Sequence, residues 1–335
     1  MKLSRRRQAA VAAATIALVT GVSACSSGGG SSSGTTSIGK DYTVTVVSGP
    51  LSDPFFSAIK SGTEAAGKDL GITVKYTAPK DLSNPVADIT RLQTAALAGK
   101  PDAIVVSEFF PEQDPGIKKF TDAKIPTVFM NAGPNWQKLG GLNYVGEDPT
   151  VVGTGVGRRF VDAGKKNVLC VAGVPGNPVL EARCNALDKV LKANGGKSTR
   201  ITLAANQGGN PTAVGNAISG ALRKDTSIDA VFTLGSALAE SAARSVDSVG
   251  SKAVIGTTDL STNVLKLIKS GDIEFAADQQ PYLTGYYSVL IAAQYLQAGL
   301  HPVGPIDTAP NWITKDNVDQ VIESNKGAKG IRGAA

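Results

Sequence analysis

The chain has 335 residues, of which 34 are Lys or Arg and 28 are Asp or Glu, giving a formal net charge of +6. Four of the basic residues lie within the first seven positions, so the rest of the chain carries 30 basic and 28 acidic residues. Such a nearly neutral body lacks the basic face that nucleic acid requires, and nucleic acid is therefore excluded as a partner.

Residues 1–24 have the pattern of a signal peptide. A positive segment with three consecutive arginines precedes Ala9–Val22, an almost wholly apolar stretch that is too short to span a bilayer comfortably. Small residues then lead directly to Cys25, as in a bacterial lipobox, whose cysteine takes a diacylglyceryl group. An ordinary signal peptide with an incidental cysteine is the alternative. The arginines leave open whether export follows the Sec or the twin-arginine route.

Residues 25–40 are expected to form a lipid-anchored flexible linker. Ser26–Gly39 consists almost entirely of Ser, Gly and Thr, a composition that buries no apolar surface and behaves as a flexible coil. No later apolar run approaches the ~20 residues needed to span a bilayer. We therefore expect the lipid on Cys25 to be the only membrane attachment, with the protein on the outer face of the cytoplasmic membrane.

From Asp41 onward, β-branched runs of strand length alternate with amphipathic runs of helical length. The first series comprises strands at 42–47, 72–76, 103–106 and 127–129 and helices at 55–70, 86–98 and 117–123. The second comprises helices at 151–163, 178–194, 212–223, 237–249 and 261–269 and strands at 167–172, 199–203, 229–233 and 252–255. Repeated β-α-β units predict an α/β fold with parallel sheets flanked by helices. Two series without a long linker predict two lobes joined by short crossings that form a hinge beside a cleft.

If Cys25 is lipidated, Cys170 and Cys184 remain as a pair. Cys170 lies in the strand predicted at 167–172, and Cys184 lies on the helix that follows it. A strand and a helix packed on it bring two Cα atoms within ~7 Å, and closing so short a loop contributes about 3 kcal/mol. We favour a disulfide over two buried free thiols, because exported proteins fold in oxidising surroundings.

The chain lacks most of the groups on which enzymes rely. Its one histidine, His301, lies in a Gly-Leu-His-Pro-Val-Gly segment that has the composition of a surface loop. Triads that depend on histidine and zinc sites therefore lack their parts. No Walker A motif or dinucleotide-binding fingerprint is present. We expect no catalytic residue, no metal site and no cofactor.

Polar and aromatic residues instead follow the predicted strands, at the edge where open α/β sheets bind ligands. Carboxylates and amides bind neighbouring hydroxyls, arginine donates several hydrogen bonds from one plane, and an aromatic face covers the C–H side of a sugar ring. Each residue alone has a plainer interpretation, since Asp53 could simply cap the helix that follows it. The predicted ligand-binding residues are Asp53, Phe55, Phe56, Ser107, Glu108, Asn131, Arg183, Asp259 and Gln279.

The order of motifs resembles the periplasmic ribose-binding-protein family, the type I solute receptors of ABC importers for sugars and polyols. The resemblance covers residues 41–325 and rests on seven segments: Leu51-Ser-Asp-Pro-Phe-Phe-Ser57, Ile125–Asn131, Tyr144–Asp148, Leu180–Cys184, Asp229–Thr233, Gly256–Leu260 and Asp278–Tyr282. It implies two Rossmann-like lobes joined by a three-strand hinge. The N-terminal lobe would comprise 41–146 plus 281–308, and the C-terminal lobe 147–280 plus 309–328.

The resemblance also implies roles for single residues. Asp53 occupies the place of a polar residue that binds sugar hydroxyls, and Phe56 that of an aromatic residue that stacks on the ring. Arg183, Asp259 and Gln279 match ligand-binding positions of the same types.

The chain departs from the family pattern at two places. Many members have an Asp-Arg pair where this chain has Asn131-Ala132, and position 235, often Asn in sugar binders, is Gly235. Losing an arginine and an amide favours a small sugar or sugar alcohol of the pentose, pentitol or tetritol type.

The resemblance implies a receptor that captures its ligand by cleft closure and delivers it to an ABC transporter permease. We expect a monomer, because the sequence shows no heptad pattern or extended apolar patch. A chemosensory or quorum-signal receptor of the same fold, binding a small hydroxylated signalling molecule, is the main alternative. An exported enzyme lacks the expected chemical groups. A sugar-responsive transcription factor would carry a helix-turn-helix where the signal peptide stands.

Overall fold

The structure is a computed structural model that describes residues 41–81, 84–204, 207–327 and 330–334. The predicted signal peptide, the linker and the lipidation site Cys25 lie outside the described residues. Within them, no helix is long and apolar enough to cross a membrane.

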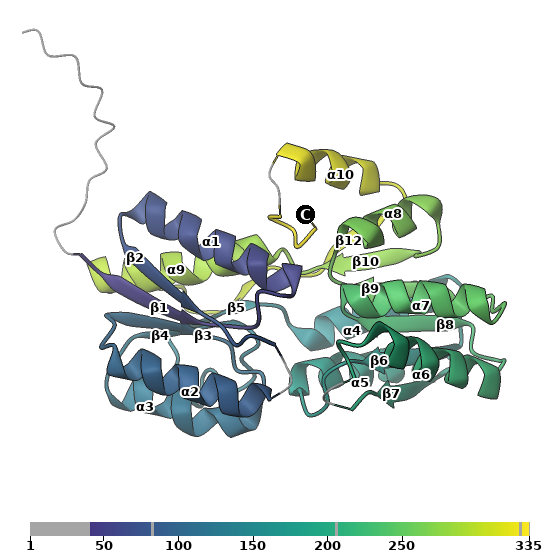
Figure 1. The fold of residues 1–335 in the computed structure, drawn as a ribbon, viewed down its shortest axis with the longest axis horizontal. Coiled ribbons are helices and arrows are strands. Elements are labelled where there is room, and N and C mark those ends of the chain that lie inside the picture. The colour runs from purple at the N-terminus through teal and green to yellow at the C-terminus, as the bar shows by residue number, and fades with distance from the viewer. Residues whose placement is uncertain (1–40, 82–83, 205–206, 328–329, 335) are drawn as a thin grey trace, which may run out of the picture. The chain divides into compact units, whose positions relative to one another are not determined.

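The N-terminal lobe contains a six-stranded sheet in which every bonded pair of strands is parallel. The strand order is β11-β5-β4-β3-β1-β2, with β1 at Thr43–Val47, β2 at Thr73–Thr77, β3 at Ala103–Val106, β4 at Thr127–Asn131, β5 at Asn143–Gly146 and β11 at Ile306–Asp307. Helices α1 (Pro54–Leu70) and α9 (Pro281–Ala298) cover one face of this sheet, and α2 (Pro85–Ala98) and α3 (Asp114–Asp122) cover the other (Figure 1).

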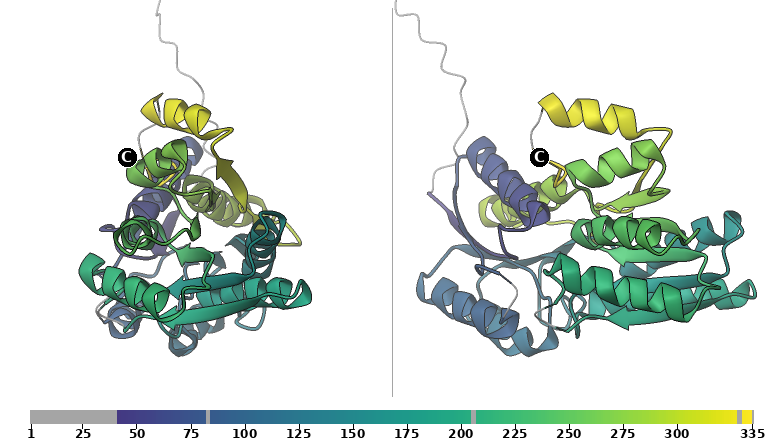
Figure 2. Two further views of the ribbon diagram at one scale, coloured as in Figure 1. Left: turned by 90° about the vertical axis from the view of Figure 1, so that its right-hand side faces the viewer. Right: turned by 45° about the vertical axis from the view of Figure 1, so that its right-hand side comes forward.

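The C-terminal lobe contains a second six-stranded sheet, in the order β12-β10-β9-β8-β6-β7. Its strands are β6 (Asn167–Ala172), β7 (Lys197–Thr202), β8 (Ala230–Leu234), β9 (Val254–Thr258), β10 (Phe275–Asp278) and β12 (Asn311–Thr314). Only β12 is antiparallel to its neighbour. The helices are α4 (Pro149–Asp162), α5 (Pro178–Ala193), α6 (Pro211–Lys224), α7 (Ser236–Ser248), α8 (Thr262–Ser270) and α10 (Val318–Gly327). The two further views in Figure 2 show helices on both sides of the sheets.

Five helices begin with the same local signature, an Asp or Asn followed by Pro, and in four of them the side chain caps the helix. Asp53, Asp148, Asn177 and Asn210 are N-caps whose side chains accept hydrogen bonds from backbone N–H groups of the first turn. Proline suits the next position, because its missing N–H would have no partner there and its φ is already helical. The capping role considered for Asp53 is thus present, with Phe55 N donating to Asp53 Oδ1 at 3.0 Å.

Alternation along strand β6 produces two separate core clusters in the C-terminal lobe. Leu169 and Val171 join one cluster with α6, α7 and α8, whereas Val168 and Cys170 join the other with α4 and α5. This division follows from the period of two in a β-strand, which sends successive side chains to opposite faces. The N-terminal lobe has a cluster of its own around β1, β3 and β4.

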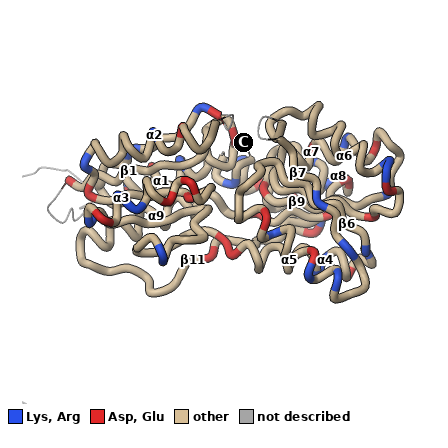
Figure 3. Tube along the Cα trace, turned by 90° about the horizontal axis from the view of Figure 1, so that it is seen from below, with Lys and Arg blue, Asp and Glu red and all other residues tan. Residues whose placement is uncertain are grey.

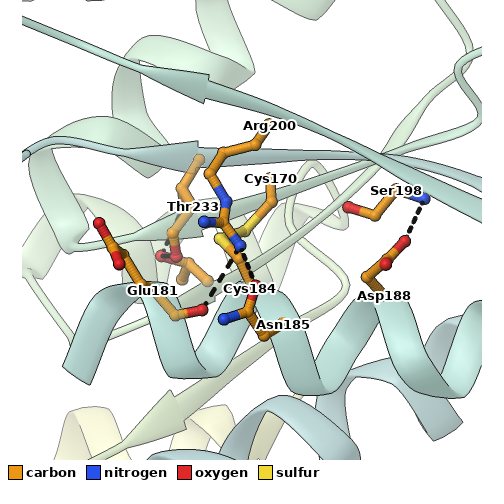
Figure 4. Close-up of a disulfide and its surroundings, with 9 residues drawn as sticks. Cys170, Glu181, Cys184, Asn185, Asp188, Ser198, Arg200 and Thr233 are labelled. Carbon is orange, nitrogen blue, oxygen red and sulfur yellow. Dashed lines mark hydrogen bonds between the residues drawn. A yellow bond between two sulfur atoms is a disulfide. The ribbon is translucent and has the colours of Figure 1, made fainter. Parts of the chain in front are cut away.

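Cys170 of β6 and Cys184 of α5 form a disulfide, with their Cα atoms 6.1 Å apart. Figure 4 shows this bond between the sheet and α5. Arg200 of β7 adds a tie beside it, since its Nη2 donates to Asn185 Oδ1 at 2.7 Å. The first helix after β6 is therefore fixed to the sheet both covalently and through hydrogen bonds.

The chain crosses between the lobes three times within the described residues, after β5, after β10 and after β11. The predicted fold class, α/β with two lobes and sheets flanked by helices, is confirmed. Basic and acidic residues are interspersed along the chain in both lobes (Figure 3), in keeping with the balanced charge after the first seven residues.

Candidate functional site

A cavity of about 120 Å³ lies where the carboxyl ends of the two sheets meet. The N-terminal lobe contributes Asp53, Phe55, Phe56, Phe109, Phe110, Asn131 and Ala132, the C-terminal lobe contributes Val174, Asn177, Val179, Leu180, Arg183, Leu234 and Asp259, and the β10–α9 crossing contributes Gln279. A wider outer cavity of about 500 Å³ shares Asp53, Phe110, Val174 and Leu234 with it and includes Gly235. Since both lobes line the inner cavity, a ligand there would contact both at once.

Of the nine predicted ligand-binding residues, seven line this cavity: Asp53, Phe55, Phe56, Asn131, Arg183, Asp259 and Gln279. They come from α1, β4, α5, the segment after β9 and the segment after β10. Segments far apart in the sequence therefore converge as the topological argument expects. Ser107 and Glu108 are not among the lining residues.

Arg183 is held by a chain of hydrogen bonds that ends at Asp259. Its Nε donates to Glu147 Oε1 at 2.5 Å and its Nη2 donates to Gln279 Oε1 at 3.0 Å. Gln279 Nε2 in turn donates to Asp259 Oδ1. Arg183 is 3% exposed and Glu147 is 1% exposed, so their ion pair is screened from water. A buried guanidinium held at two points presents its remaining N–H groups in a fixed plane.

Glu147, which the sequence analysis did not select, is the anchor of this network. It lies in the first crossing between the lobes, directly after β5. Its backbone N–H donates to the hydroxyl of Tyr144, which itself donates to Asn131 O at 2.8 Å. Burial raises the pKa of the Glu147 carboxyl, and the Arg183 guanidinium opposes that rise. The crossing is thus linked to cavity residues of both lobes.

Two cavity residues adopt left-handed backbone conformations at matching places in the two sheets. Asn131 ends β4 with φ 62°, and Asp259 follows β9 with φ 67°. For residues other than glycine this conformation carries a cost, and such strain concentrates at functional sites. The two residues thus reach the cavity from equivalent positions in the two sheets.

One wall of the cavity is aromatic. The rings of Phe55 and Phe56 lie edge to face with centroids 5.2 Å apart, and Phe56 meets Phe109 in the same way at 5.8 Å. All three rings are at most 8% exposed. Gly49 permits this packing, because a Cβ there would lie 2.3 Å from the Phe56 ring. Such a wall supplies apolar contact for the C–H surface of a ligand.

The carboxyls of the cavity are easier to protonate than ordinary aspartates. Burial raises the pKa of Asp259 to about 7; Asp53 adds to this rise, and Arg183 and the hydrogen bond from Gln279 oppose it. Although Asp53 as a residue is exposed, burial of its carboxyl also raises its pKa against the hydrogen bond from Phe55. The carboxyl of Asp259 is therefore expected to gain or lose its proton near neutral pH.

Glu108 serves a different purpose from the one expected. It is 1% exposed, and its carboxylate accepts hydrogen bonds from Asn135 N at 3.0 Å and Asn135 Nδ2 at 2.7 Å. Burial raises the pKa of Glu108 to about 7, while Asn135 opposes the rise. Glu108 thus fixes, from outside the cavity, the loop after β4, which begins at Ala132 directly after Asn131. Ser107 is wholly buried beside it.

Several cavity residues were missed by sequence reasoning. Phe109 and Phe110 directly follow Ser107 and Glu108. The prediction therefore identified the correct strand end, but the residues that line the cavity lie one to three positions further along the chain. Asn177 could have been found from its Asn-Pro signature, because the same amide that caps α5 also lines the cavity. The remaining additions are apolar and carried no signal in the sequence.

Two lobes, three crossings and a cavity lined from both sides define a binding protein of the cleft type. A family model described as the periplasmic binding protein domain matches residues 44–300, and the chain belongs to this family. Within the described residues, no group of three or more His, Cys, Asp or Glu side chains is placed to hold a metal ion.

Known proteins similar to this chain support the same assignment. The chain is 33% identical to a carbohydrate transporter from Acidothermus cellulolyticus 11B, solved in complex with myo-inositol, with a TM-score of 0.79 over 88% of this chain and 100% of that one. It resembles a glucose-galactose binding protein from Geobacillus stearothermophilus in fold, at 21% identity and a TM-score of 0.76, over 83% and 99% of the two chains. A xylose/arabinose-binding protein from Sulfolobus acidocaldarius is 23% identical over 309 residues, 85% of this chain and 74% of that protein.

Proposed function

We propose that this protein is an extracytoplasmic solute-binding lipoprotein that captures a small neutral sugar or sugar alcohol and delivers it to an ABC transporter permease. The observation that carries the proposal is the Arg183–Gln279–Asp259 chain facing an aromatic wall inside a cavity that both lobes line. When the cleft closes on a ligand, all these groups would contact it. The higher affinity of the ligand for the closed state would drive closure.

The polar groups of the cavity suit a ring or chain of hydroxyls. Asp53 and Asp259 accept hydrogen bonds, the Arg183 guanidinium donates them, and Asn131 and Gln279 are able to do both. A hydroxyl both donates and accepts, so adjacent hydroxyls pair with alternating groups of this kind. The residues that line the cavity include no His, Cys, Lys or Ser, which favours binding over catalysis.

The pair Asn131-Ala132 favours a cyclic polyol within this class. A pyranose ring oxygen only accepts hydrogen bonds, and the arginine that many family members have at the second position is a donor suited to it. Ala132 cannot donate from its side chain. An inositol has a hydroxyl at every ring carbon and no ring oxygen, so it does not need that donor. The bound myo-inositol in the structure 33% identical to this chain points the same way.

Membrane attachment and transport complete the proposal. The lipobox at Cys25 and the Ser/Gly-rich segment after it support a lipid anchor that holds a monomeric receptor at the outer face of the cytoplasmic membrane. Family membership supports delivery to a permease.

Thermal unfolding of the purified protein with myo-inositol, pentitols, pentoses and hexoses tests this function. A ligand at a hundred times its Kd stabilises the folded state by about 2.7 kcal/mol, which is readily detected. We expect myo-inositol to raise the melting temperature more than the aldoses do. A panel without any stabilising member would refute the proposal.

A matched pair of variants locates the binding site in the same assay. Arg183→Lys keeps the charge but cannot bond Glu147 and Gln279 from one plane, and it should lose most of the stabilisation by myo-inositol. Arg200→Lys makes the same exchange at an exposed arginine of β7, outside the cavity. This variant should keep the stabilisation by myo-inositol. Equal responses from both variants would place the ligand elsewhere.

A further inference from the structure

The segment Gly330–Ala334, called the strap below, lies against both lobes. A Cβ placed on Gly333 would lie 3.3 Å from Phe55 Cα, at the start of α1 in the N-terminal lobe, and 3.6 Å from Leu260 O in the C-terminal lobe. Gly333 has φ 73°, a backbone conformation that suits glycine. Figure 1 shows this end of the described chain beside the start of α1 and near β10 and β12.

An ion pair holds Arg332 of the strap, and apolar packing together with a hydrogen bond holds Ala334. Arg332 Nη1 donates to Asp278 Oδ2 at 2.8 Å, and Asp278 is 1% exposed at the end of β10. The other oxygen, Asp278 Oδ1, accepts from Gln280 N at 2.8 Å within the crossing to α9. Ala334 is wholly buried in the core cluster that contains Leu260, and its carbonyl accepts a hydrogen bond from Asn325. Because Ala334 is buried and Arg332 pairs with a buried carboxylate, the strap is packed as part of the fold.

Three contacts of the strap fall on a cavity residue or on the chain neighbour of one. Phe55 itself lines the cavity, Leu260 follows Asp259, and Asp278 precedes Gln279. These residues come from the N-terminal lobe, the C-terminal lobe and the crossing between them. A single short segment therefore supports the outer side of the ligand-binding wall in all three parts.

We propose that the strap positions the ligand-binding wall and restrains the opening of the cleft, with Arg332 as its positioning residue. Opening would separate Phe55 from Leu260, and the strap would then lose its contact with one of them. The Arg332–Asp278 ion pair keeps the strap seated, because removing one partner leaves the buried Asp278 carboxyl without its countercharge. Ligand affinity would thus depend on a residue that does not touch the ligand. That consequence rests on the proposed function, whereas the restraint on the lobes does not.

Hydrogen exchange of the full-length protein without ligand tests the restraint directly. In Arg332→Gln, we expect amides in 55–60 of α1 and in 275–280 to exchange about ten-fold faster than in the wild type, as local opening becomes easier. Lys326→Gln removes an exposed ion pair with Glu323 from α10, just before the strap, and should leave both segments unchanged. Faster exchange in 275–280 and α10 with no change in 55–60 would reduce the strap to a part of the C-terminal lobe and overturn the proposal.

Dissociation of myo-inositol provides the second readout. Arg332→Gln should release it about ten-fold faster than the wild type, and Arg332→Lys should recover part of the difference because it restores the charge. If Arg332→Gln does not fold, Asp278→Asn breaks the same ion pair from the other side. If the wild type does not bind myo-inositol, the proposed ligand is wrong, and the exchange experiment still decides on the strap. Equal dissociation from wild type and Arg332→Gln would contradict the positioning role.

Discussion

At the scale of single residues, the cavity owes its polarity to groups that are bonded to one another before any ligand arrives. Arg183 is shared between Glu147 and Gln279, and Gln279 is shared between Arg183 and Asp259. Side chains held in this way need little further ordering when a ligand binds, which reduces the entropic cost of binding. The same arrangement shields the Asp259 carboxyl from water, although the residue as a whole is only half-buried.

Binding of myo-inositol should depend on pH through Asp259. Its pKa in the empty cavity is raised to about 7, mainly by burial, and a ligand hydroxyl that donates to it favours the ionised form. Below pH 7 the ligand must therefore displace a proton, and affinity should rise with pH by up to about ten-fold per unit and level off above pH 7. Calorimetric titrations between pH 5.5 and 8.5 measure this slope.

Asp259→Asn is the control for that titration. The amide keeps the size of the side chain and can still accept from Gln279, but it does not ionise. We expect weaker binding, by about 1–3 kcal/mol, and a flatter pH profile. A profile as steep as that of the wild type would mean that another group, such as Asp53, carries the proton.

The residue types at the strand ends could be predicted from the sequence, but the directions in which their side chains point could not. Asp53, Asn131 and Asp259 were selected because parallel strands end at one edge, and the cavity contains them. Glu108 has the same topological position, yet Asn135 from the loop after β4 covers it. That contact joins residues 27 positions apart, and no local pattern encodes it.

At the scale of elements, the predictable helices are those with one apolar face and a recognisable start. The helices from α1 to α8 were identified to within a few residues, and the Asp-Pro and Asn-Pro signatures explain where five of them begin. Helix α9 was not assigned. It packs on α1 and on the sheet, so apolar residues occur on most of its sides and the helical period is weak. Strands β5, β10, β11 and β12 were not assigned either. They have two to four residues each and lack the β-branched run of β3, which is equally short but reads Ala-Ile-Val-Val.

The contact between α1 and α9 depends on glycine. A Cβ on Gly285 would lie 2.2 Å from Ile59 O, and a Cβ on Gly62 would lie 2.0 Å from Tyr282 O. The obstructing atoms belong to the backbone and cannot rotate away. Gly285→Ala should therefore push the helices apart and destabilise the protein by about 1–3 kcal/mol or more, measured by chemical denaturation.

Gly220→Ala serves as the matched control for this experiment. Gly220 lies on the exposed side of α6, and a Cβ there meets nothing within 4 Å. Alanine should be neutral or stabilise the helix by up to about 1 kcal/mol. If both variants behaved alike, the effect at Gly285 would reflect helix propensity and not the close approach of two backbones.

At the scale of the whole molecule, the two lobes are separate packing units that share a binding site. The N-terminal lobe has one core cluster, which Val179 of α5 joins from the other lobe, and the C-terminal lobe has two, one on each face of its sheet. The sequence was sufficient to predict two βα series and hence two lobes. The sequence could not predict the cavity. The shape of the cavity depends on which side chains meet from segments far apart in the sequence, and no local pattern encodes those contacts.

The disulfide tests how independent the lobes are. Cys170 and Cys184 are 14 residues apart, and both belong to the C-terminal lobe, so their bond constrains the unfolded state of that lobe alone. Replacing both by Ala should cost about 3 kcal/mol in the chain-entropy model. Because the N-terminal lobe does not share that core, we expect faster hydrogen exchange in β6, β8 and α5 and no change in β1 and β3. Equal acceleration of exchange in both sheets would show that the two lobes unfold as one unit. A ligand bound between the lobes would then stabilise both, because their unfolding is already coupled without it.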